Sequence, residues 1–473
     1  MSLLVLDIGS SSVRALLYDE SARPIPGAVA RRAHSFTTWA DGTSIADAVH
    51  LRTLTEACID EVLAHPAAGA IQAVGMATFV GNLVGLDAVG QAATPVYTYA
   101  DTRCAAVLET LREQIDLEDT HQRTGCPHYT AYHPAKLRWL AEQGIRAAQW
   151  SDIGSYCYRA WFGRQVPCSY SVAAWSGLLN REALTWDAEW LSLLGHTPDD
   201  LPPLADYTTA QTGLASAYAA RWPVLKDVPF LLAVGDGAAA NIGSGAVGPG
   251  QAALTIGTTA ALRIIRTEAL PPVPAGCWSY RVDAKRHLIG GATNEGGSTI
   301  AWVRETFKVP EDAEAQLVTR PADSHGLTFL PFLTGERSPG YRAEASGTLH
   351  GLRAATTPLD VLQAAMEGVA LRLAAIAESL GNDFAQVFAG GGALQASTVW
   401  AQICANALDQ PLALLSEAET TARGVALLAL EAVRPEAVVA QLPTTRILPD
   451  SAAVQIMRQA RARQAELYAR LYG

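Results

Sequence analysis

Asp236 is well placed for acid–base chemistry, because it lies between two glycines directly after an apolar run. Residues 231–234 predict a buried strand, and the small residues after Gly237 predict the start of a helix. A carboxylate at such a junction can act as a catalytic base beside a phosphate that the helix amides hold. It can equally serve as a cap of that helix. From this stretch alone both interpretations stay open.

Two similar hairpins, one in each half of the chain, could hold phosphate groups. Strands are predicted at 3–6 and 13–18, and again at 253–256 and 260–265. The tips carry glycine and hydroxyl residues, which let backbone N–H groups approach an anion closely. Many hairpin tips of this composition bind nothing, but two matched copies favour a phosphate role. The tip residues are Gly9, Ser10, Ser11 and Ser12 in the first copy and Gly257, Thr258 and Thr259 in the second.

The two copies differ in charge. Asp7 precedes the first tip, and Thr255 has the same position before the second tip, so the first copy alone offers a carboxylate to a cation. Both copies carry an arginine shortly afterwards, Arg14 and Arg263. Repetition of this kind predicts two related domains, each with one hairpin.

Further glycine and charged residues follow the same pattern of strand, turn and helix. Gly390, Gly391 and Gly392 come after an apolar run and before a predicted helix at 398–408, where a nucleotide can approach the backbone. Asp101 and Arg103 lie two residues apart in a predicted loop. A local ion pair is the simplest reading of these two residues, and such a pair contributes little to stability.

Alternating helices and strands predict an α/β protein with mixed sheets. We expect helices at 45–63, 134–142 and 359–380, the last one capped by Thr357 with Pro358 at its first position. Strands are expected at 70–77 and 83–87, and irregular structure with short helices at 151–230, on one side of a cleft. A Gly-rich stretch at 244–250 predicts a boundary between domains 1–246 and 247–473.

Composition excludes several classes of protein. With a net charge of -11 and 49% hydrophobic residues, the chain is predicted to be globular and not to bind nucleic acid. No apolar stretch is long enough to span a bilayer, so no membrane partner is expected. Seven scattered cysteines without a CxxC pair predict buried free thiols and a cytoplasmic location. A homodimer is the default assembly for a soluble enzyme.

Taken together, these motifs resemble the FGGY family of carbohydrate kinases, in the actin/hexokinase ATPase superfamily. The resemblance runs along almost the whole chain, and it includes His133-Pro-Ala-Lys136 and Gly335-Glu336-Arg337-Ser-Pro339 besides the motifs above. It implies two ribonuclease-H-like domains with a cleft between them. It also implies the use of ATP, Mg²⁺ and a small polyhydroxylated substrate.

The resemblance further implies a role for each motif. Asp236 would be the catalytic base, kept ionised by the helix N-terminus. Asp7 would hold Mg²⁺ through water. The phosphates would be bound by Gly9, Ser10, Ser11, Ser12, Arg14, Gly257, Thr258 and Thr259, and the adenosine by Gly390, Gly391 and Gly392.

Among the branches of the family, the sequence is similar to gluconokinases. Asp101 and Arg103 match positions near the sugar site, and an arginine there could bind a substrate carboxylate. The sequence departs from the family where gluconokinases carry Met-His, because Gly81 stands at the histidine position. Thr78 or Asn82 would then supply the missing polar contact.

Three functions follow, with D-gluconate phosphorylation first. The second is a xylulokinase or another pentulose or polyol kinase, with Phe79 and Gly81 reshaping the sugar pocket. The third is a non-catalytic actin-like ATPase that works as a sensor or chaperone. Asp236 argues against the third, since such an ATPase has no use for a base on the substrate side.

Overall fold

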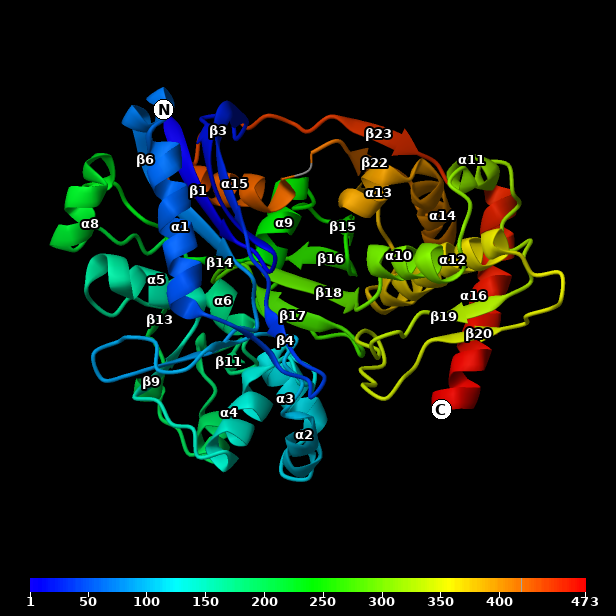
Figure 1. Cartoon of the computed structure of the whole chain (residues 1–473), viewed down its shortest axis with the longest axis horizontal. Coiled ribbons are helices and arrows are strands. Elements are labelled where there is room, and N and C mark those ends of the chain that lie inside the picture. Colours follow the sequence, from blue (N-terminus) through cyan, green and yellow to red (C-terminus); the bar gives the residue numbers. More distant parts are fainter. Residues whose placement is uncertain (418) are drawn as a thin grey trace.

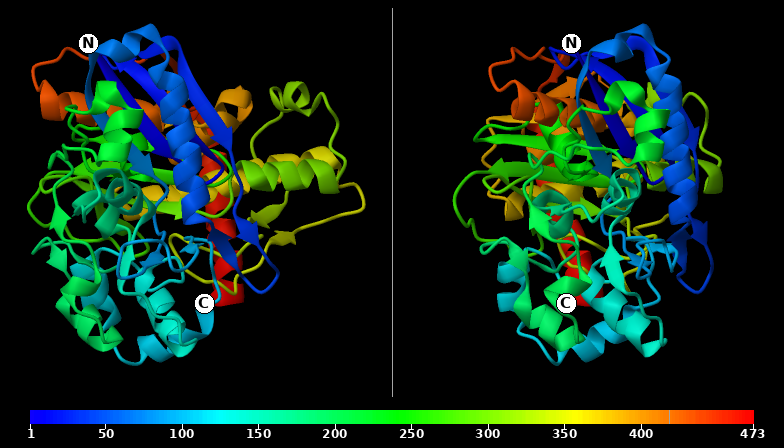
Figure 2. Two further views of the ribbon diagram at one scale, coloured as in Figure 1. Left: turned by 60° about the vertical axis from the view of Figure 1, so that its left-hand side comes forward. Right: turned by 90° about the vertical axis from the view of Figure 1, so that its left-hand side faces the viewer.

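The structure is a computed structural model that describes residues 1–417 and 419–473. Two sheets with helices packed on them make up most of the molecule (Figure 1). A group of short helices and strands lies below the first sheet in that view. When the molecule is turned, the first sheet and helix α1 (Ala48–Leu63) come to the front (Figure 2).

The first sheet has five strands in the order β14-β6-β1-β2-β3. Strand β1 pairs antiparallel with β2 and parallel with β6, and β14 continues the parallel part beside β6. All residues of β1 are buried, which fits the unbroken apolar run at the start of the chain. The strands are β1 (Ser2–Ile8), β2 (Ser12–Asp19), β3 (Pro24–Ala33), β6 (Ile71–Thr78) and β14 (Val234–Gly235).

The second sheet has seven strands in the order β17-β18-β16-β15-β21-β22-β23. Its inner five, from β18 to β22, repeat the pairing of the first sheet: two antiparallel contacts and then two parallel ones. The two predicted ribonuclease-H-like units are therefore confirmed. The strands are β15 (Gln251–Ile256), β16 (Ala260–Arg266), β17 (Trp278–Arg281), β18 (His287–Thr293), β21 (Gln386–Gly390), β22 (Leu412–Leu415) and β23 (Thr444–Ile447).

Helices α9 (Asp236–Ser244) and α15 (Thr420–Val433) pack closely against each other beside the first sheet. Their backbones touch at two glycines: a Cβ on Gly243 would lie 1.8 Å from the Thr420 carbonyl oxygen, and a Cβ on Gly424 would lie 1.7 Å from that of Ala239. Larger side chains at either glycine would force the helices apart. Although α15 comes late in the sequence, its apolar face completes the core under β1 and β6.

Helix α12 (Pro358–Ser379) is the central helix of the second unit, and it packs on β16 and β18. Thr357 caps it as predicted, in a capping box with Asp360. Around it lie α10 (Gly297–Thr306), α11 (Ala313–Leu317), β19 (Thr328–Leu330), β20 (Thr348–His350), α13 (Gly392–Ala396), α14 (Thr398–Leu408) and α16 (Ser451–Tyr472).

The helix expected at 45–63 begins later than predicted. Residues Ser44–Ala46 form β5, which pairs with β4 (Thr37–Thr38) and β8 (Val96–Tyr97). Asp47 then caps α1 by accepting a hydrogen bond from the His50 amide at 2.9 Å. The amphipathic pattern extended past the true start because Ile45 also faces inward from its strand.

Residues 84–221 form the lower group of elements and, at their end, helix α8 beside α1; over 151–230 the structure has short helices among irregular stretches, as expected. In this group, helix α5 starts at Asp152, whose side chain accepts from the Gly154 and Ser155 amides. The elements are β7 (Val84–Leu86), α2 (Ala105–Arg112), α3 (Leu117–Thr124), α4 (His133–Glu142), β9 (Gln149–Ser151), α5 (Ile153–Phe162), β10 (Cys168–Ser169), α6 (Tyr170–Ala174), β11 (Leu179–Asn180), β12 (Thr185–Trp186), α7 (Ala188–Leu194), β13 (Leu204–Ala205) and α8 (Ser216–Arg221).

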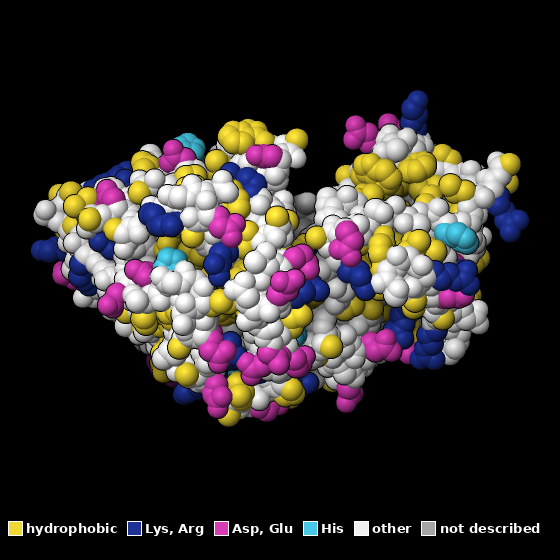
Figure 3. Space-filling view, turned by 90° about the horizontal axis from the view of Figure 1, so that it is seen from below, with side chains coloured by type: hydrophobic (Ala, Val, Ile, Leu, Met, Phe, Trp, Pro, Cys, Tyr) yellow, Lys and Arg dark blue, Asp and Glu magenta, His cyan; other side chains and the backbone are white. Residues whose placement is uncertain are grey.

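The surface agrees with the composition. On the described face shown in Figure 3, lysine and arginine side chains are scattered among acidic ones and form no broad basic area. All seven cysteines are buried free thiols. Among the helices of residues 1–417 and 419–473, none combines the length and apolar character needed to cross a bilayer.

Candidate active site

The carboxyl ends of β1, β6 and β14 meet at one edge of the first sheet and bring three predicted site residues together. Thr78, at the end of β6, is paired with Ile8 of β1 on one side and with Gly235 of β14 on the other. Asp7 and Asp236 are therefore close neighbours of Thr78 along this edge. The Thr78 hydroxyl is fully buried and has no hydrogen-bond partner among the described residues.

Asp236 is the first residue of α9, and Gly235 occupies the N-cap position. The Asp236 Oδ1 accepts a hydrogen bond from the Gly237 amide at 2.7 Å. The indole of Trp175 lies over this turn, since a Cβ on Gly235 would be 2.7 Å from Trp175 Nε1 and one on Gly237 would be 2.9 Å from its ring. Both glycines are thus required by the tryptophan, and Asp236 is held between them.

The pKa of Asp236 differs from the sequence expectation. A helix N-terminus was expected to keep the pKa low, but burial raises it to about 6 and outweighs the opposing effects. The Gly237 amide and the guanidinium groups of Arg263 and Arg337 lower the pKa in the other direction. Asp236 is consequently ionised in most molecules at neutral pH, yet it can accept a proton more readily than an exposed aspartate.

The first hairpin tip is closed by a hydrogen bond from the Gly9 amide to the Ser12 carbonyl at 3.0 Å. Ser10 and Ser11 are exposed at the tip, whereas Ser12 is buried in β2. Ser12 can therefore offer its backbone to a ligand less readily than its two neighbours. Of the four predicted tip residues, Gly9, Ser10 and Ser11 remain suitably placed to contact phosphate.

Arg14 is engaged with two acidic residues of the first unit and α15. Its Nη2 lies 2.9 Å from Asp7 Oδ2, and its Nη1 contacts Glu419. Asp7 is 1% exposed, and its Oδ2 receives no well-aligned hydrogen bond. Burial raises the pKa of Asp7 to about 6 even though Arg14 lowers it. A buried carboxylate oxygen with free capacity is suited to a cation.

The second hairpin tip has a tighter closure, from the Gly257 amide to the Thr259 carbonyl two residues later at 2.9 Å. Thr258 and Thr259 are exposed, as Ser10 and Ser11 are in the first tip. The start of α10 is fixed to this tip, because the Gly297 amide donates to the Gly257 carbonyl at 2.7 Å. The tip is thus held rigidly while its outer side stays open to a ligand.

The Gly390-Gly391-Gly392 turn lies beside the second hairpin. Gly391 has a φ of 97°, and a Cβ there would lie 2.4 Å from the Ile256 carbonyl oxygen. This close approach requires glycine at the position. Gly390 pairs with Thr255, so the turn is next to Gly257 and Thr258. The sequence-predicted nucleotide residues of the second unit are therefore brought together.

A cavity of about 270 Å³ lies between the two units, with Asp236 in its wall. Aromatic rings form one side: Trp175 stacks on Tyr280 with ring centroids 3.7 Å apart, and Trp278 stacks on Tyr280 at 4.3 Å. Two arginines, Arg263 and Arg337, also line it. Its other residues include Ser10, Gly81, Tyr99, Tyr132, Thr255 and Thr259. We refer to this cavity as the cleft.

Four residues predicted to bind substrate do not line the cleft: Thr78, which is fully buried at the end of β6, and Asn82, Asp101 and Arg103. Asn82 is buried and bonded on both sides, to the Ile153 amide at 2.8 Å and the Phe79 carbonyl at 2.5 Å. Asp101 binds Arg103 through both carboxylate oxygens. The Arg103 guanidinium also lies 4.6 Å from the Trp139 ring centroid. The structure thus shows the local ion pair, and Arg103 does not line the cleft.

The aromatic wall and the role of Arg263 were not predicted from the sequence. Trp278 and Tyr280 alternate along β17 and point to the same side, which is a period-two signal that could have been noticed. Arg263 was noted only as a basic residue after the second tip. Its position in the cleft depends on the strand pairing of β16 with β15, which places it diagonally opposite Thr255.

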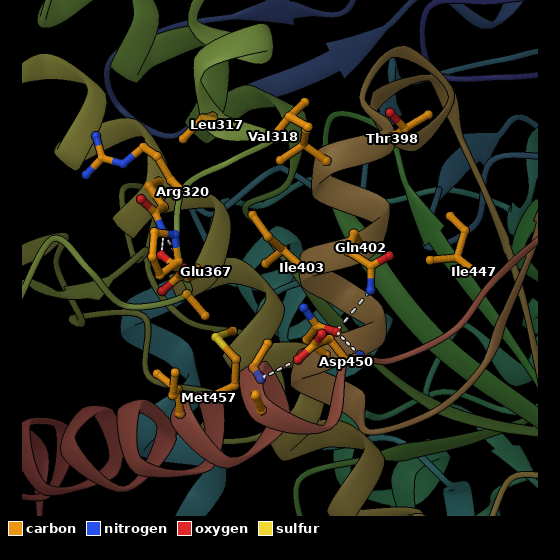
Figure 4. A pocket seen from close by; sticks show the side chains of 18 of the residues that line it. Leu317, Val318, Arg320, Glu367, Thr398, Gln402, Ile403, Ile447, Asp450 and Met457 are labelled. Carbon is orange, nitrogen blue, oxygen red and sulfur yellow. Dashed lines mark hydrogen bonds between the residues drawn. The ribbon is translucent and has the colours of Figure 1, made fainter.

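A cavity of about 720 Å³ lies elsewhere in the second unit, between α11, α12, α14 and α16 (Figure 4). None of the predicted site residues lines it. Two of its polar side chains pair with each other, since Gln402 donates to Asn406 at 3.0 Å, and Arg320 pairs with Asp360 next to the cavity. This cavity shows no acid or base free for catalysis, so the cleft is the better candidate for an active site.

Comparison with known proteins agrees with this geometry. Residues 2–243 match the FGGY family of carbohydrate kinases, N-terminal domain, and residues 252–433 match the C-terminal domain. The gluconokinase of Bacillus subtilis (strain 168) is 26% identical over 455 residues, covering 91% of this chain and 87% of the relative.

Solved structures share the fold. A gluconate kinase from Lactobacillus acidophilus superposes with a TM-score of 0.92 at 24% identity, covering 100% of this chain and 98% of its own. A ligand-bound xylulose kinase from the same organism also gives 0.92 at 24%, covering 99% and 98%. Because both family domains match and the fold agrees, the chain belongs to the FGGY family of carbohydrate kinases.

Proposed function

We propose that the protein transfers the γ-phosphoryl group of ATP to a hydroxyl of a small sugar acid, with D-gluconate as the first candidate. The observation that carries this proposal is the position of Asp236, half-buried at the edge of the first sheet and facing the cleft between two phosphate-type hairpins. The gluconokinase relative supports the choice of acid.

In the reaction, Asp236 would accept the proton of the attacking hydroxyl and orient it toward the phosphorus. The open tips of the two hairpins would hold the phosphates through Gly9, Ser10, Ser11, Gly257, Thr258 and Thr259. The Gly390–Gly392 turn would hold the adenosine. Aromatic rings around the cleft would keep water from taking the phosphoryl group.

Asp7 is the residue that would hold Mg²⁺, because it is buried and its Oδ2 has free acceptor capacity. When bound, the ion would neutralise charge on the phosphates. Arg14 contacts the same Oδ2 at 2.9 Å, so the ion would share this oxygen with the guanidinium. The residues of the two tips are glycine, serine and threonine, which donate hydrogen bonds but carry no positive charge. The charge of the phosphates would therefore be neutralised by the bound metal ion.

A neutral pentulose or polyol is the second candidate substrate. Gly81, which lines the cleft with a φ of 66°, offers no side chain for a polar sugar contact. Its Cβ position is only 3.0 Å from Tyr99 Cβ, so no histidine could be accommodated there without movement. The contacts to hydroxyl groups in this region are therefore fewer, which leaves substrate choice to other side chains.

The test is an ADP-release assay with D-gluconate, D-xylulose, D-ribulose, glycerol and related sugar acids. We expect D-gluconate or a close sugar acid to give the highest kcat/KM. Preference for a ketose or for glycerol would replace the first candidate by the second. ATP turnover that no polyhydroxylated compound stimulates would contradict the kinase proposal as a whole.

A further inference from the structure

Two arginines of the second unit face the cleft without a carboxylate partner of their own. Arg263 comes from the middle of β16, and Arg337 comes from the loop that follows β19. Within residues 1–417 and 419–473, the Arg263 side chain has one contact, from Nη1 to Thr255 Oγ1 at 3.4 Å, and its Nε has no acceptor. The Arg337 guanidinium forms no ion pair in the same range.

The acidic residues near Arg337 are already occupied. Glu336, its neighbour in sequence, pairs with Arg372 and accepts a hydrogen bond from Tyr468 Oη at 2.6 Å. Glu295 accepts from the Thr334 amide and hydroxyl, and burial raises its pKa to about 7, so that it is protonated in many molecules at neutral pH. The carboxylate that lines the cleft with the two guanidinium groups is Asp236, whose pKa both of them lower.

This arrangement leaves the cleft with surplus positive charge. Desolvating a cation without a partner is costly, and the cost is offset when an anion binds. A further donor without an acceptor, Trp175 Nε1, lies in the same wall, and Trp175 is 9% exposed. The cleft therefore fits a ligand that is rich in acceptors and carries at least one negative charge.

The anion could belong to the nucleotide or to the substrate, and the surroundings favour the substrate. Neutral tyrosines lie near the Arg337 guanidinium, namely Tyr129, Tyr132, Tyr280 and Tyr341, and two of them, Tyr132 and Tyr280, line the cleft. Arg263 lies near Trp175, since a Cβ on Gly237 would be within 3.7 Å of Arg263 Nε and 2.9 Å of the indole. The nucleotide turn at 390–392 does not line this cavity.

We propose that Arg263 and Arg337 bind the carboxylate of a sugar-acid substrate, so that the second unit selects acids while Asp236 of the first unit faces the reacting hydroxyl. This proposal rests on the proposed kinase function. It also replaces Arg103, which is paired with Asp101, as the residue for acid recognition. A planar guanidinium can donate two parallel hydrogen bonds to a carboxylate, which lysine cannot match.

The experiment compares D-gluconate with D-glucitol, the neutral alcohol of the same carbon chain, in the wild type and in Arg263→Gln, Arg263→Lys and Arg337→Gln. Arg103→Gln is the matched control, because it removes an arginine outside the cleft. Binding is measured by calorimetry with a non-hydrolysable ATP analogue, and KM for ATP is measured separately. Thermal unfolding checks that each variant is folded.

We expect each Arg→Gln variant in the cleft to bind D-gluconate roughly 10- to 100-fold more weakly, as loss of a charged hydrogen bond predicts. Arg263→Lys should restore part of that loss. Affinity for D-glucitol and KM for ATP should change by less than about threefold, and Arg103→Gln should leave all of these values near the wild type.

Three results would overturn the assignment. In the first, Arg263→Gln and Arg337→Gln retain gluconate affinity. In the second, KM for ATP rises as much as the gluconate dissociation constant, which would place the arginines on the phosphates. In the third, Arg103→Gln shows the selective loss. If the wild type phosphorylates neutral sugars but neither binds nor phosphorylates any sugar acid, the proposed acid substrate fails on the wild type alone, before any variant is considered.

Discussion

In the first hairpin Arg14 reaches across the strand pair to Asp7, whereas in the second hairpin Arg263 reaches Thr255. Each tip is closed by a hydrogen bond from its glycine amide, to the carbonyl three residues later in the first tip and two residues later in the second. The arginines differ in register as well, because Arg14 lies directly opposite Asp7, whereas Ala261 lies opposite Thr255 and Arg263 follows two residues later.

The difference extends to the surroundings. Arg14 has a second acidic partner, Glu419 at the start of α15, so its charge is neutralised on two sides. The one hydrogen-bond partner of Arg263 among the described residues is the Thr255 hydroxyl. Arg263 and Arg337 both interact with the charge of Asp236 and lower its pKa. One copy of a repeated hairpin therefore presents a carboxylate to a cation, while the other presents a guanidinium to an anion. The change from acid to threonine before the tip and the different register positions of the two arginines together produce this division.

The largest effect is expected at Asp236, which lines the cleft together with residues of both hairpins. Asp236→Asn removes the proton acceptor with little change in size. We expect kcat to fall by roughly 10²- to 10⁴-fold, the usual contribution of general base catalysis. ATP affinity should be largely retained, because the hairpin tips are untouched. Single-turnover kinetics and nucleotide titration would check this, and near wild-type kcat would remove Asp236 from the mechanism.

The next effect concerns the acid of the first hairpin. Asp7→Asn keeps the shape but removes the charge that would hold Mg²⁺, and it leaves Arg14 with Glu419 alone. We expect kcat to fall by about 100-fold and the Mg²⁺ concentration needed for half-maximal activity to rise. Activity titrated with Mg²⁺ measures both. Thr255→Asn, the same amide in the second hairpin, is the control and should leave the Mg²⁺ requirement unchanged.

Much of the fold was predictable because its signals are local. The apolar runs and small tips of both hairpins lie within twenty residues, and the capping of α12 by Thr357 lies within four. Pairing of the repeats then gives two similar sheets. The predicted start of α1 at Ile45 was wrong, because the residues of the short strand β5 continue the apolar pattern of the helix toward the N-terminus.

The charge pattern of the site was harder to predict, because it depends on contacts between distant parts of the chain. Arg14 meets Glu419, and the indole of Trp175 covers Gly235 and Gly237. The sequence position of Arg103 suits a substrate carboxylate, but in the folded chain its guanidinium donates to both carboxylate oxygens of Asp101. The types of residue in a motif do not reveal which charges are already satisfied in the folded chain.

A third prediction transfers the acid from one hairpin to the other. In Thr255→Asp, the new carboxylate lies beside Arg263 and should pair with it as Asp7 pairs with Arg14. We expect KM for a sugar acid to rise roughly 10-fold, because the guanidinium is no longer free. The isosteric Thr255→Asn carries no charge and serves as the control. Equal KM values for the two variants would show that the charge of Arg263 does not act on the substrate.

The smallest effect is a shift in pH dependence. Asp236 works in its ionised form, and its pKa is about 6, so kcat/KM should fall about tenfold per unit as the pH decreases below that value. Arg263 and Arg337 lower this pKa, and Asp7 is the other charged group that interacts with Asp236. Arg263→Gln removes one cation and should therefore raise the pKa, which moves the acidic limb of the profile to higher pH.

The shift is best measured with a neutral polyol at saturating Mg²⁺, so that carboxylate binding does not contribute. At pH 6.5 we expect Arg263→Gln to lose roughly two- to fivefold in kcat/KM relative to its own value at pH 8. Arg103→Gln should keep the wild-type profile, since its guanidinium is paired with Asp101. If the acidic limb of Arg263→Gln stayed where it is in the wild type, Arg263 would not be an electrostatic neighbour of the base. The arginine of the second hairpin would then have no influence on the pKa of the catalytic base.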